Sequence, residues 1–305
     1  MSRILLTGAS GLLGLSFGLQ YHDQHEIVGV VNEHPLKGVP FEVRQVDLAQ
    51  PGAAEKLIAE VQPEIVLHCA ALANIDQAET HPGLAQRINA EIPGEIAALM
   101  RQTGGMMIHI STDSVFDGQR GDYRETDETN PINVYARTKL AGEQAVLQAN
   151  PDAIVARVNF YGWSISGKRS LAEIFYQQLS AGKSMLGFTD VYFCPLQVNV
   201  LAEILLEMAS RQLHGLYHVV SSEALTKYDF GMRIARLFGL DETLIRPVSW
   251  QEAGLQAARS PKLTLNSEKL AGALGRTLPN QAPGLDRFLS LYREGFQAQI
   301  RNYVM

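Results

Sequence analysis

In the first half of the chain, short runs rich in valine and isoleucine alternate with longer stretches of helical character. We predict strands over residues 3–7, 26–31, 41–46, 64–68, 106–110 and 153–158, and helices over residues 12–21, 52–61, 82–103 and 131–150. Buried strands separated by helices form right-handed βαβ units, which build a parallel sheet covered on both faces. The pattern therefore predicts an α/β protein with a doubly wound parallel sheet, the Rossmann arrangement.

After about Trp163 the spacing of these elements changes. We predict helices over residues 170–182, 198–211, 226–238 and 283–303, and strands over residues 184–188 and 215–220, of which the second could return to the sheet. Thr226 is a suitable N-cap for its helix and Gly239 a suitable stop. We assign residues 1–163 and 189–222 to the sheet domain, and residues 164–188 and 223–305 to a smaller C-terminal lobe packed on it.

Net charge, cysteine count and the length of apolar runs limit where the protein can work and what it can bind. The 305 residues carry a net charge of −6 without a lysine or arginine cluster, which argues against nucleic acid or an anionic membrane as partner. Cys69 and Cys194 are too few for a disulfide framework and suit free thiols. The first apolar run is too short for a signal peptide, and no run reaches the roughly 20 apolar residues of a membrane span. We expect a soluble cytoplasmic protein without a metal site.

A glycine-rich turn separates the first strand from the first helix. It reads Thr7-Gly8-Ala9-Ser10-Gly11-Leu12-Leu13-Gly14. Glycine lets the backbone turn tightly and approach a pyrophosphate, whose charge then lies at the helix N-terminus. Glycines at a helix entry are also common for structural reasons alone, but this position favours a dinucleotide site. We expect the cofactor to contact Gly8, Ser10, Gly11, Leu12 and Gly14.

Residues at the ends of three further predicted strands could also contact a dinucleotide. Asp47 and Leu48 follow the third strand, where a carboxylate could accept a hydrogen bond from adenine, and Ala70 and Ala71 follow the fourth, where small side chains leave room for a cofactor. The second strand ends in Asn32-Glu33, with neither the usual Asp nor an Arg for a 2′-phosphate, so the choice between NAD and NADP stays open. Asn89 could contact the cofactor or simply bridge backbone groups inside the protein.

Tyr135 and Lys139 are one helical turn apart and so project from one face of the predicted helix. Such a pair occurs by chance on solvated helices, but here it follows a strand that ends in Ser111-Thr112-Asp113. Thr112 could hold a substrate oxygen, Tyr135 could exchange a proton with it, and Lys139 could hold the cofactor ribose and favour the phenolate. Lowering the tyrosine pKa by about three units requires roughly 4 kcal/mol of differential stabilisation, which the ammonium group and the positive nicotinamide ring of the oxidised cofactor could supply together.

Taken together, these motifs resemble the extended short-chain dehydrogenase/reductase superfamily and, more narrowly, the dTDP-4-dehydrorhamnose reductase family. The segments that carry the resemblance are residues 7–14, 47–48, 111–118, 123–125, 131–143, 157–162, 258–261 and 265–270. The resemblance implies that Thr112, Tyr135 and Lys139 form a catalytic triad, with Tyr135 and Lys139 also touching NADP or NAD. It implies hydride transfer from NAD(P)H to the 4-keto group of a nucleotide-linked deoxysugar, in a monomer or homodimer. Asp113, Arg157 and Phe160 would lie along the substrate cleft.

Three positions depart from the family pattern. Ser114 replaces the usual tyrosine after Thr-Asp, Phe160 replaces the usual tryptophan, and Cys194 lies in a segment that normally reads Ser-Pro-Thr. These positions shape the sugar pocket, so the particular sugar stays open. A dehydratase would carry glutamate where Ser114 stands. A nucleotide-sugar epimerase and an NADP-binding regulatory subunit, similar to the β subunit of methionine adenosyltransferase, remain as alternatives.

Overall fold

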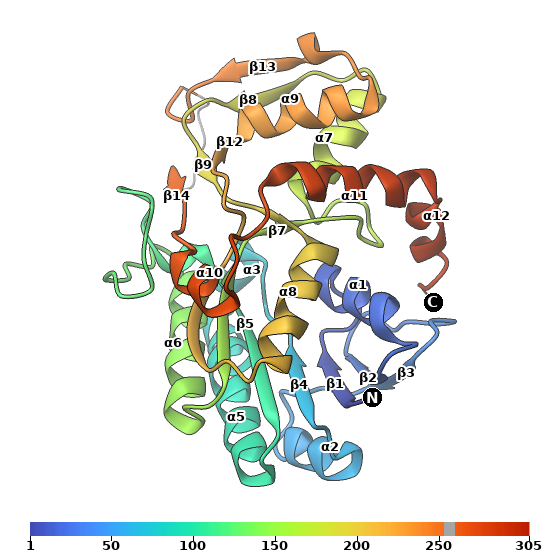
Figure 1. Cartoon of the computed structure of the whole chain (residues 1–305), viewed down its shortest axis with the longest axis vertical. Coiled ribbons are helices and arrows are strands. Elements are labelled where there is room, and N and C mark those ends of the chain that lie inside the picture. Colours follow the sequence, from blue (N-terminus) through green and yellow to red (C-terminus); the bar gives the residue numbers. More distant parts are fainter. Residues whose placement is uncertain (253–259, 305) are drawn as a thin grey trace.

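The computed structural model describes residues 1–252 and 260–304. Within these residues, seven parallel strands form one sheet in the order β11-β6-β5-β4-β1-β2-β3 (Figure 1). The strands are β1 (Arg3–Thr7), β2 (Glu26–Val31), β3 (Glu42–Gln45), β4 (Ile65–His68), β5 (Met106–Thr112), β6 (Ile154–Val158) and β11 (Gly215–Val219). The predicted doubly wound parallel sheet is confirmed, including the return of the last strand.

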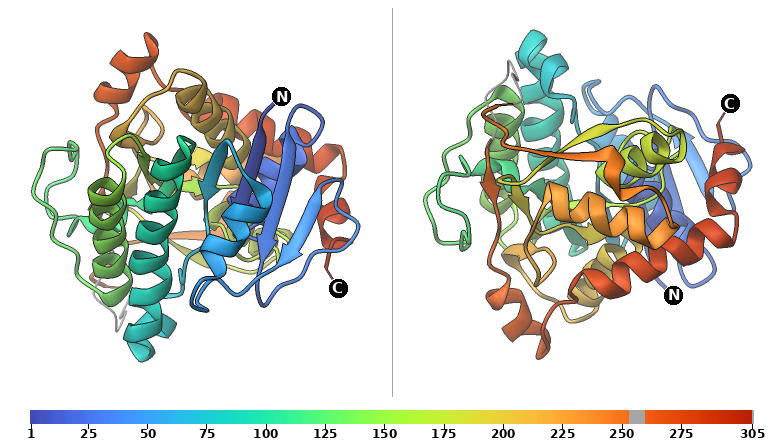
Figure 2. Two further views of the ribbon diagram at one scale, coloured as in Figure 1. Left: turned by 90° about the horizontal axis from the view of Figure 1, so that it is seen from below. Right: turned by 90° about the horizontal axis from the view of Figure 1, so that it is seen from above.

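Helices cover both faces of the sheet (Figure 2). Helices α1 (Leu12–Tyr21) and α8 (Val198–Ser210) pack together on one face, and α2 (Ala53–Val61), α5 (Ile92–Thr103) and α6 (Val134–Ala149) lie on the other. Successive side chains of a strand point to opposite faces. In β1, Ile4 and Leu6 therefore join the core beneath α1 and α8, whereas Leu5 joins the core beneath α2 and α5.

The remaining elements lie mainly beyond the carboxyl ends of the strands, in the upper half of Figure 1. They are β7 (Phe160–Tyr161), α7 (Leu171–Ser180), β8 (Met185–Phe188), β9 (Tyr192–Phe193), β10 (Leu196–Gln197), β12 (Leu225–Thr226), α9 (Lys227–Phe238), η3 (Glu242–Leu244), β13 (Ile245–Val248), β14 (Lys262–Leu263), α10 (Glu268–Leu274), α11 (Gln281–Arg293) and α12 (Phe296–Arg301). Trp163 stacks on Phe288 with ring centroids 4.0 Å apart and donates its indole N–H to the Phe288 carbonyl. Both rings belong to the core that also lies beneath α1 and α8.

Local capping explains where several of these helices begin and end. Thr226 caps α9 by accepting from the Asp229 N–H, and Gly239 ends the helix in a left-handed conformation, as predicted. The predicted helix over residues 283–303 is instead two helices, α11 and α12. Gly295, with φ of 76°, separates them because a left-handed residue ends an α-helix.

The predicted helix over residues 82–103 is interrupted as well. It consists of α4 (Pro82–Gln86), a π-helical turn η1 (Arg87–Glu91) and α5, and is preceded by α3 (Ile75–Thr80). Pro93 has no N–H to offer the carbonyl of Asn89 four residues earlier, which weakens the regular α-helix at this point. The Asn89 carbonyl faces Gly142 of α6.

The Asn89 side chain secures the same region. Its amide oxygen accepts from the Leu72 N–H at 2.8 Å, and its amide nitrogen donates to the Leu72 carbonyl and, at 3.0 Å, to the Thr138 hydroxyl. The bridging interpretation of Asn89 is therefore confirmed. Because Thr138 lies in α6, this one buried amide joins the loop after β4 to the helix that carries Tyr135 and Lys139.

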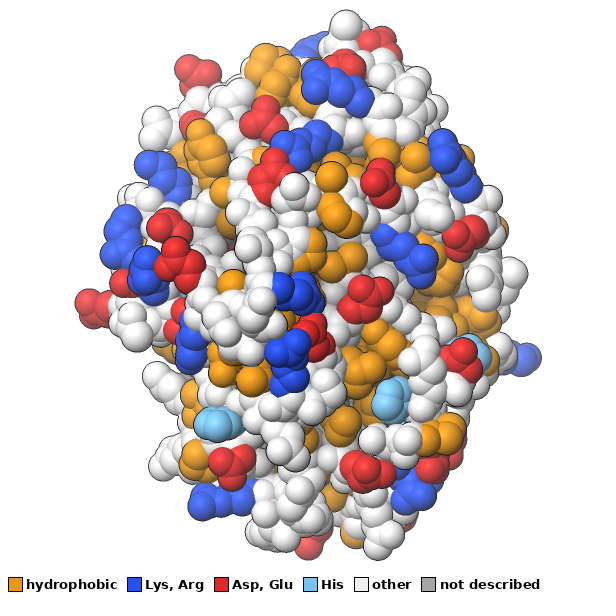
Figure 3. All heavy atoms as spheres, in the orientation of Figure 1, with side chains coloured by type: hydrophobic (Ala, Val, Ile, Leu, Met, Phe, Trp, Pro, Cys, Tyr) orange, Lys and Arg blue, Asp and Glu red, His pale blue; other side chains and the backbone are white. Residues whose placement is uncertain are grey.

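No helix among the described residues is long and apolar enough to cross a membrane. Acidic and basic side chains are interspersed over the face of the molecule shown in Figure 3. Cys69, partly buried, and Cys194, buried, are both free thiols, as expected.

We predict that Gly142→Ala destabilises the protein by about 1–3 kcal/mol, because the new methyl would lie 2.1 Å from the Asn89 carbonyl oxygen and α6 must shift to admit it. Chemical denaturation of the purified variants measures the effect. Gly272→Ala in α10 is the matched control, since its methyl meets no atom within 4 Å and alanine favours a helix. Equal stability losses in the two variants would contradict the close approach.

Candidate active site

The site lies at the carboxyl ends of the central strands, where the strand order reverses between β1 and β4. Gly8 follows β1 with φ of +68°, a left-handed conformation that side chains disfavour. A Cβ on Gly8 would lie 2.8 Å from the Ala70 nitrogen, and one on Gly14 would lie 2.3 Å from the Gly8 carbonyl oxygen. The turn therefore requires glycine at both positions, for backbone conformation and for space.

The first turn of α1 is left open to an anion. Gly11 occupies the N-cap, makes no side-chain cap, and no acidic residue lies in the first turn. The uncapped N–H groups and the positive end of the helix dipole together suit a pyrophosphate. Ser10, just before the cap, is partly exposed, whereas Leu12 is buried. These residues fit the dinucleotide that the sequence predicts.

The other residues predicted to contact the cofactor follow β2, β3 and β4. The Asp47 carboxylate accepts from the Ala49 N–H at 3.0 Å and from the Gln50 side chain at 2.9 Å, so it organises its own turn, and Leu48 is buried beneath it. Asn32 is exposed after β2. After β4, Ala70 is partly exposed and adjoins Gly8, and Ala71 is exposed.

Thr112 ends β5, and Tyr135 is the second residue of α6, which Asn133 caps by accepting from the Ala136 N–H. Burial raises the pKa of Tyr135 to about 12, an effect opposed by the neighbouring Thr112 hydroxyl and reinforced by the charge of Asp113. The phenol therefore lies close to the threonine hydroxyl. At neutral pH and without cofactor, Tyr135 carries its proton.

Asp113 is buried directly beside this pair. Its carboxylate accepts from the Thr112 hydroxyl at 3.1 Å and from the Ser114 hydroxyl at 3.3 Å, and also from the amide of Asn159. Burial raises the pKa of Asp113, and these hydrogen bonds together with the positive charge of Lys227 oppose the rise. The Thr112 proton thus points to Asp113 and must turn away from it to reach a substrate oxygen.

Lys139 is placed differently from the expectation. The residue is 2% exposed, and its ammonium group donates to the Ile110 carbonyl at 2.6 Å, with the His109 ring nitrogen at 3.4 Å. Burial lowers the pKa of Lys139 to about 8. The groups that perturb Tyr135 are Thr112 and Asp113, so Lys139 does not depress the tyrosine pKa in this arrangement. In the cofactor-free protein the pKa of Tyr135 is therefore raised, and the lowering expected with the oxidised cofactor bound stays a prediction.

The expected substrate contact of Arg157 is wrong. Its guanidinium is 3% exposed, forms an ion pair of 2.7 Å with Glu143 and lies over the Phe116 ring. The group is therefore enclosed behind β5 and β6, where substrate cannot reach it. Phe160, by contrast, is partly exposed in β7 beside Asn159.

Two residues of this site were missed from the sequence. Asn159 holds Asp113, and Lys227 brings a positive charge to it from the first turn of α9. Asn159 stands beside Phe160 in a segment already noted, so its position was a usable signal. Lys227 is distant in sequence and carries no motif that points to Asp113.

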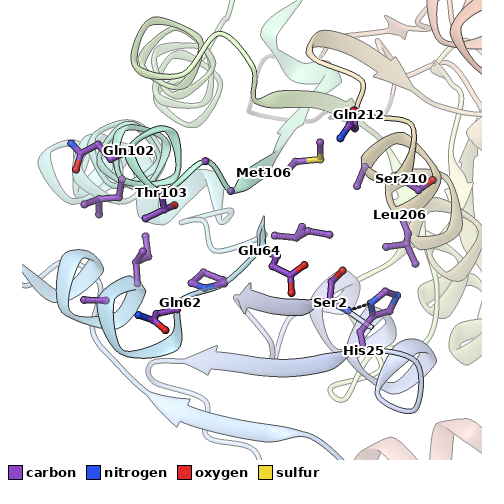
Figure 4. A pocket seen from close by; sticks show the side chains of 18 of the residues that line it. Ser2, His25, Gln62, Glu64, Gln102, Thr103, Met106, Leu206, Ser210 and Gln212 are labelled. Carbon is purple, nitrogen blue, oxygen red and sulfur yellow. Dashed lines mark hydrogen bonds between the residues drawn. The ribbon is translucent and has the colours of Figure 1, made fainter.

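A groove of about 1390 Å³ lies at the opposite end of the sheet (Figure 4). Ser2, Glu64 and Met106, at the amino ends of β1, β4 and β5, line it, and none of Thr112, Tyr135 and Lys139 does. Ligands of doubly wound sheets bind at the carboxyl ends of the strands, so this groove is not the catalytic site.

With this geometry established, the protein can be compared with known proteins. A probable low-salt glycan biosynthesis reductase, Agl14, of Haloferax volcanii is 35% identical over 280 residues, which cover 90% of this chain and 93% of the relative. A dTDP-4-dehydrorhamnose reductase of Mycobacterium tuberculosis is 33% identical over 88% of this chain and 86% of its own. Methionine adenosyltransferase 2 subunit beta of Bos taurus is 32% identical over 90% of this chain and 84% of its own.

A solved structure shares the whole fold. The dTDP-4-dehydrorhamnose reductase of Bacillus anthracis, in complex with NADP, superposes with a TM-score of 0.84 at 26% identity, over 95% of this chain and 99% of that chain. The fold and the glycine turn are those of the nicotinamide-dependent oxidoreductases of the extended short-chain dehydrogenase/reductase type, a class that uses NAD or NADP.

Within that class, the family model of the RmlD substrate binding domain matches residues 1–294, and the chain belongs to this family. The resemblance stated from the motifs is thereby confirmed. Of the C-terminal motif over residues 258–261, the first two residues lie outside the described part of the structure.

We predict that Gly8→Ala weakens NAD(P)H binding by at least about tenfold, which corresponds to 1.4 kcal/mol of binding energy, because the methyl group displaces the turn from Ala70. Quenching of protein fluorescence during cofactor titration measures the dissociation constant. Gly38→Ala is the control: its φ is also positive, at +73°, but its methyl group meets nothing within 4 Å. Similar weakening in both variants would indicate general strain and not loss of the cofactor cradle.

Proposed function

We propose that this protein reduces the 4-keto group of a nucleotide-linked 6-deoxysugar, with Tyr135 as the proton donor. The observation that carries the proposal is that the Tyr135 phenol lies close to Thr112, which ends β5 at the same edge of the parallel sheet as the glycine turn after β1. Membership of the RmlD family and the similarity to dTDP-4-dehydrorhamnose reductases support the substrate class.

NAD(P)H, when bound, supplies the hydride. The pyrophosphate would be held by the Gly8–Gly14 turn and the open N-terminus of α1. Thr112 would donate a hydrogen bond to the substrate carbonyl oxygen and so orient it. As negative charge develops on that oxygen, Tyr135 would transfer its phenolic proton to it and leave an alcohol. The phenolate would then regain a proton from solvent.

The raised pKa of Tyr135 supports the reductive direction, since a proton donor must be protonated at neutral pH. Asp113 would control Thr112: while the carboxylate accepts the threonine proton, the hydroxyl cannot donate to substrate. Asn159 and Phe160 would form the adjoining wall of the sugar pocket. We propose that the protein works in the cytoplasm, as a monomer or homodimer.

Purified protein is expected to oxidise NADH or NADPH when a dTDP-4-keto-6-deoxysugar is added, as followed at 340 nm. Tyr135→Phe should lower kcat by about 10²–10⁴-fold while the protein stays folded, because the hydroxyl proton is lost and the ring is kept. Tyr21→Phe is the matched control: it removes another hydroxyl whose pKa burial raises to about 12, at the far end of α1. Full activity in Tyr135→Phe would exclude the proposed donor.

The alternatives give different results in the same experiment. An epimerase would retain tightly bound NAD through purification and interconvert sugars without net cofactor oxidation. The similarity to methionine adenosyltransferase 2 subunit beta supports a second candidate, a cofactor-binding regulatory subunit. That role predicts cofactor binding without turnover of any nucleotide 4-ketosugar, together with a changed activity of an added methionine adenosyltransferase catalytic subunit.

A further inference from the structure

Glu143 is a buried carboxylate on the catalytic helix to which the proposed reaction assigns no role. It lies one turn beyond Lys139 in α6 and is 3% exposed. Its carboxylate accepts a hydrogen bond of 2.5 Å from the Ser111 hydroxyl and bonds of 3.0 and 2.7 Å from the Arg157 guanidinium. A charged group this deep is tolerated only when it is paired and hydrogen-bonded, and here both conditions are met.

Arg157 is held on every side. Besides Glu143, its guanidinium approaches the His218 ring nitrogen of β11 at 3.4 Å and lies 5.0 Å above the centre of the Phe116 ring. The other ring nitrogen of His218 lies 3.1 Å from the Asn266 carbonyl. The chain of contacts therefore runs from α6 through β6 to β11 and on to residue 266.

The ends of this network adjoin the reacting groups. Ser111 directly precedes Thr112 in β5, and Glu143 stands four residues after Lys139 and eight after Tyr135, on the same side of α6. A single carboxylate thus joins the strand that presents the threonine to the helix that presents the tyrosine and lysine. Loss of these hydrogen bonds would release α6 from β5 and so change the distance between the threonine and the tyrosine.

We propose that Glu143, paired with Arg157, is a positioning residue of the active site: it fixes α6 on β5. Its carboxylate stands one helical turn from Lys139 and also favours the charged ammonium group. The kinetic consequence rests on the proposed function, whereas the effects on α6 and on Lys139 hold whatever the substrate is.

Glu143 is the charged neighbour that stabilises the ammonium form of Lys139, because the other titratable groups around this lysine are neutral. From β5, the ammonium group faces His109 and the Ile110 carbonyl; from the end of β4, it faces His68 and Cys69. Burial is the main cause that lowers the pKa values of His68 and His109, and Lys139 adds to it, so both rings are neutral. Burial raises the pKa of Cys69, so it is an uncharged thiol. Glu143 raises the pKa of Lys139 against the effect of burial.

The test compares three variants of the full chain. Glu143→Gln removes the charge but leaves Arg157 unpaired, so Glu143→Gln/Arg157→Met, which removes both charges, provides a variant without a buried lone cation. Glu143→Asp keeps the charge and shortens the side chain. NMR of ¹⁵N-labelled lysine side chains measures the pKa of Lys139 without substrate, with Lys139→Met used to assign the signal.

We expect the pKa of Lys139 to fall by about one unit in Glu143→Gln and in the double variant, and to stay near the wild-type value in Glu143→Asp. We expect kcat to fall on the order of 100-fold in all three, with a smaller change in KM, because the reacting groups are misplaced. Glu173→Gln is the control: Glu173 is also fully buried and holds Ser164 and Ser170, but it lies in α7, away from Lys139.

An unchanged Lys139 pKa in both charge-removing variants overturns the electrostatic role, and an unchanged kcat overturns the positioning role. The same changes in Glu173→Gln would reduce the effect to a general loss of stability, which also overturns the proposal. If wild-type protein turns over no ketosugar but the Lys139 pKa falls as expected, the proposed function fails while the role of Glu143 in charging Lys139 stands.

Discussion

Polar contacts inside the protein hold helix α6 on the sheet, and the geometry of the active site depends on them. Gly142 lets the helix approach the Asn89 carbonyl on one side, while Glu143 binds Ser111 and Arg157 on the other. Such buried groups contribute little net stability, because desolvation offsets much of their attraction. Their directional bonds nevertheless favour one position of α6 over its neighbours. Tyr135, at the start of the helix, is thereby placed against Thr112.

Burial has opposite effects on the pKa values of Tyr135 and Lys139, two side chains of α6. It raises the pKa of Tyr135 to about 12, which keeps the phenol protonated, and lowers the pKa of Lys139 to about 8, which brings the amine near its titration range. In both residues burial thus favours the uncharged form. In Lys139 the charge of Glu143 opposes this effect.

The predicted helices and strands match the observed ones where residues close in sequence determine the structure. Short runs rich in valine and isoleucine identified the strands, and Thr226 and Gly239 marked the ends of α9. The predictions failed where a distant contact decides: the π-helical turn at Asn89 reflects Pro93 and the approach of Gly142, and the interior role of Arg157 reflects Glu143 from another element. Lys227 could not have been placed near Asp113 from its neighbours in the chain.

The sequence by itself determined the sheet, the glycine turn and the identity of Thr112, Tyr135 and Lys139, because each depends on residue type and on spacing along a strand or one helical turn. The tertiary structure decided where their protons lie. A pKa depends on the water that packing removes and on the charges that folding brings close. Asp113, Asn159, Glu143 and Lys227 come from four separate segments, so their effects on the site arise only when the chain is folded.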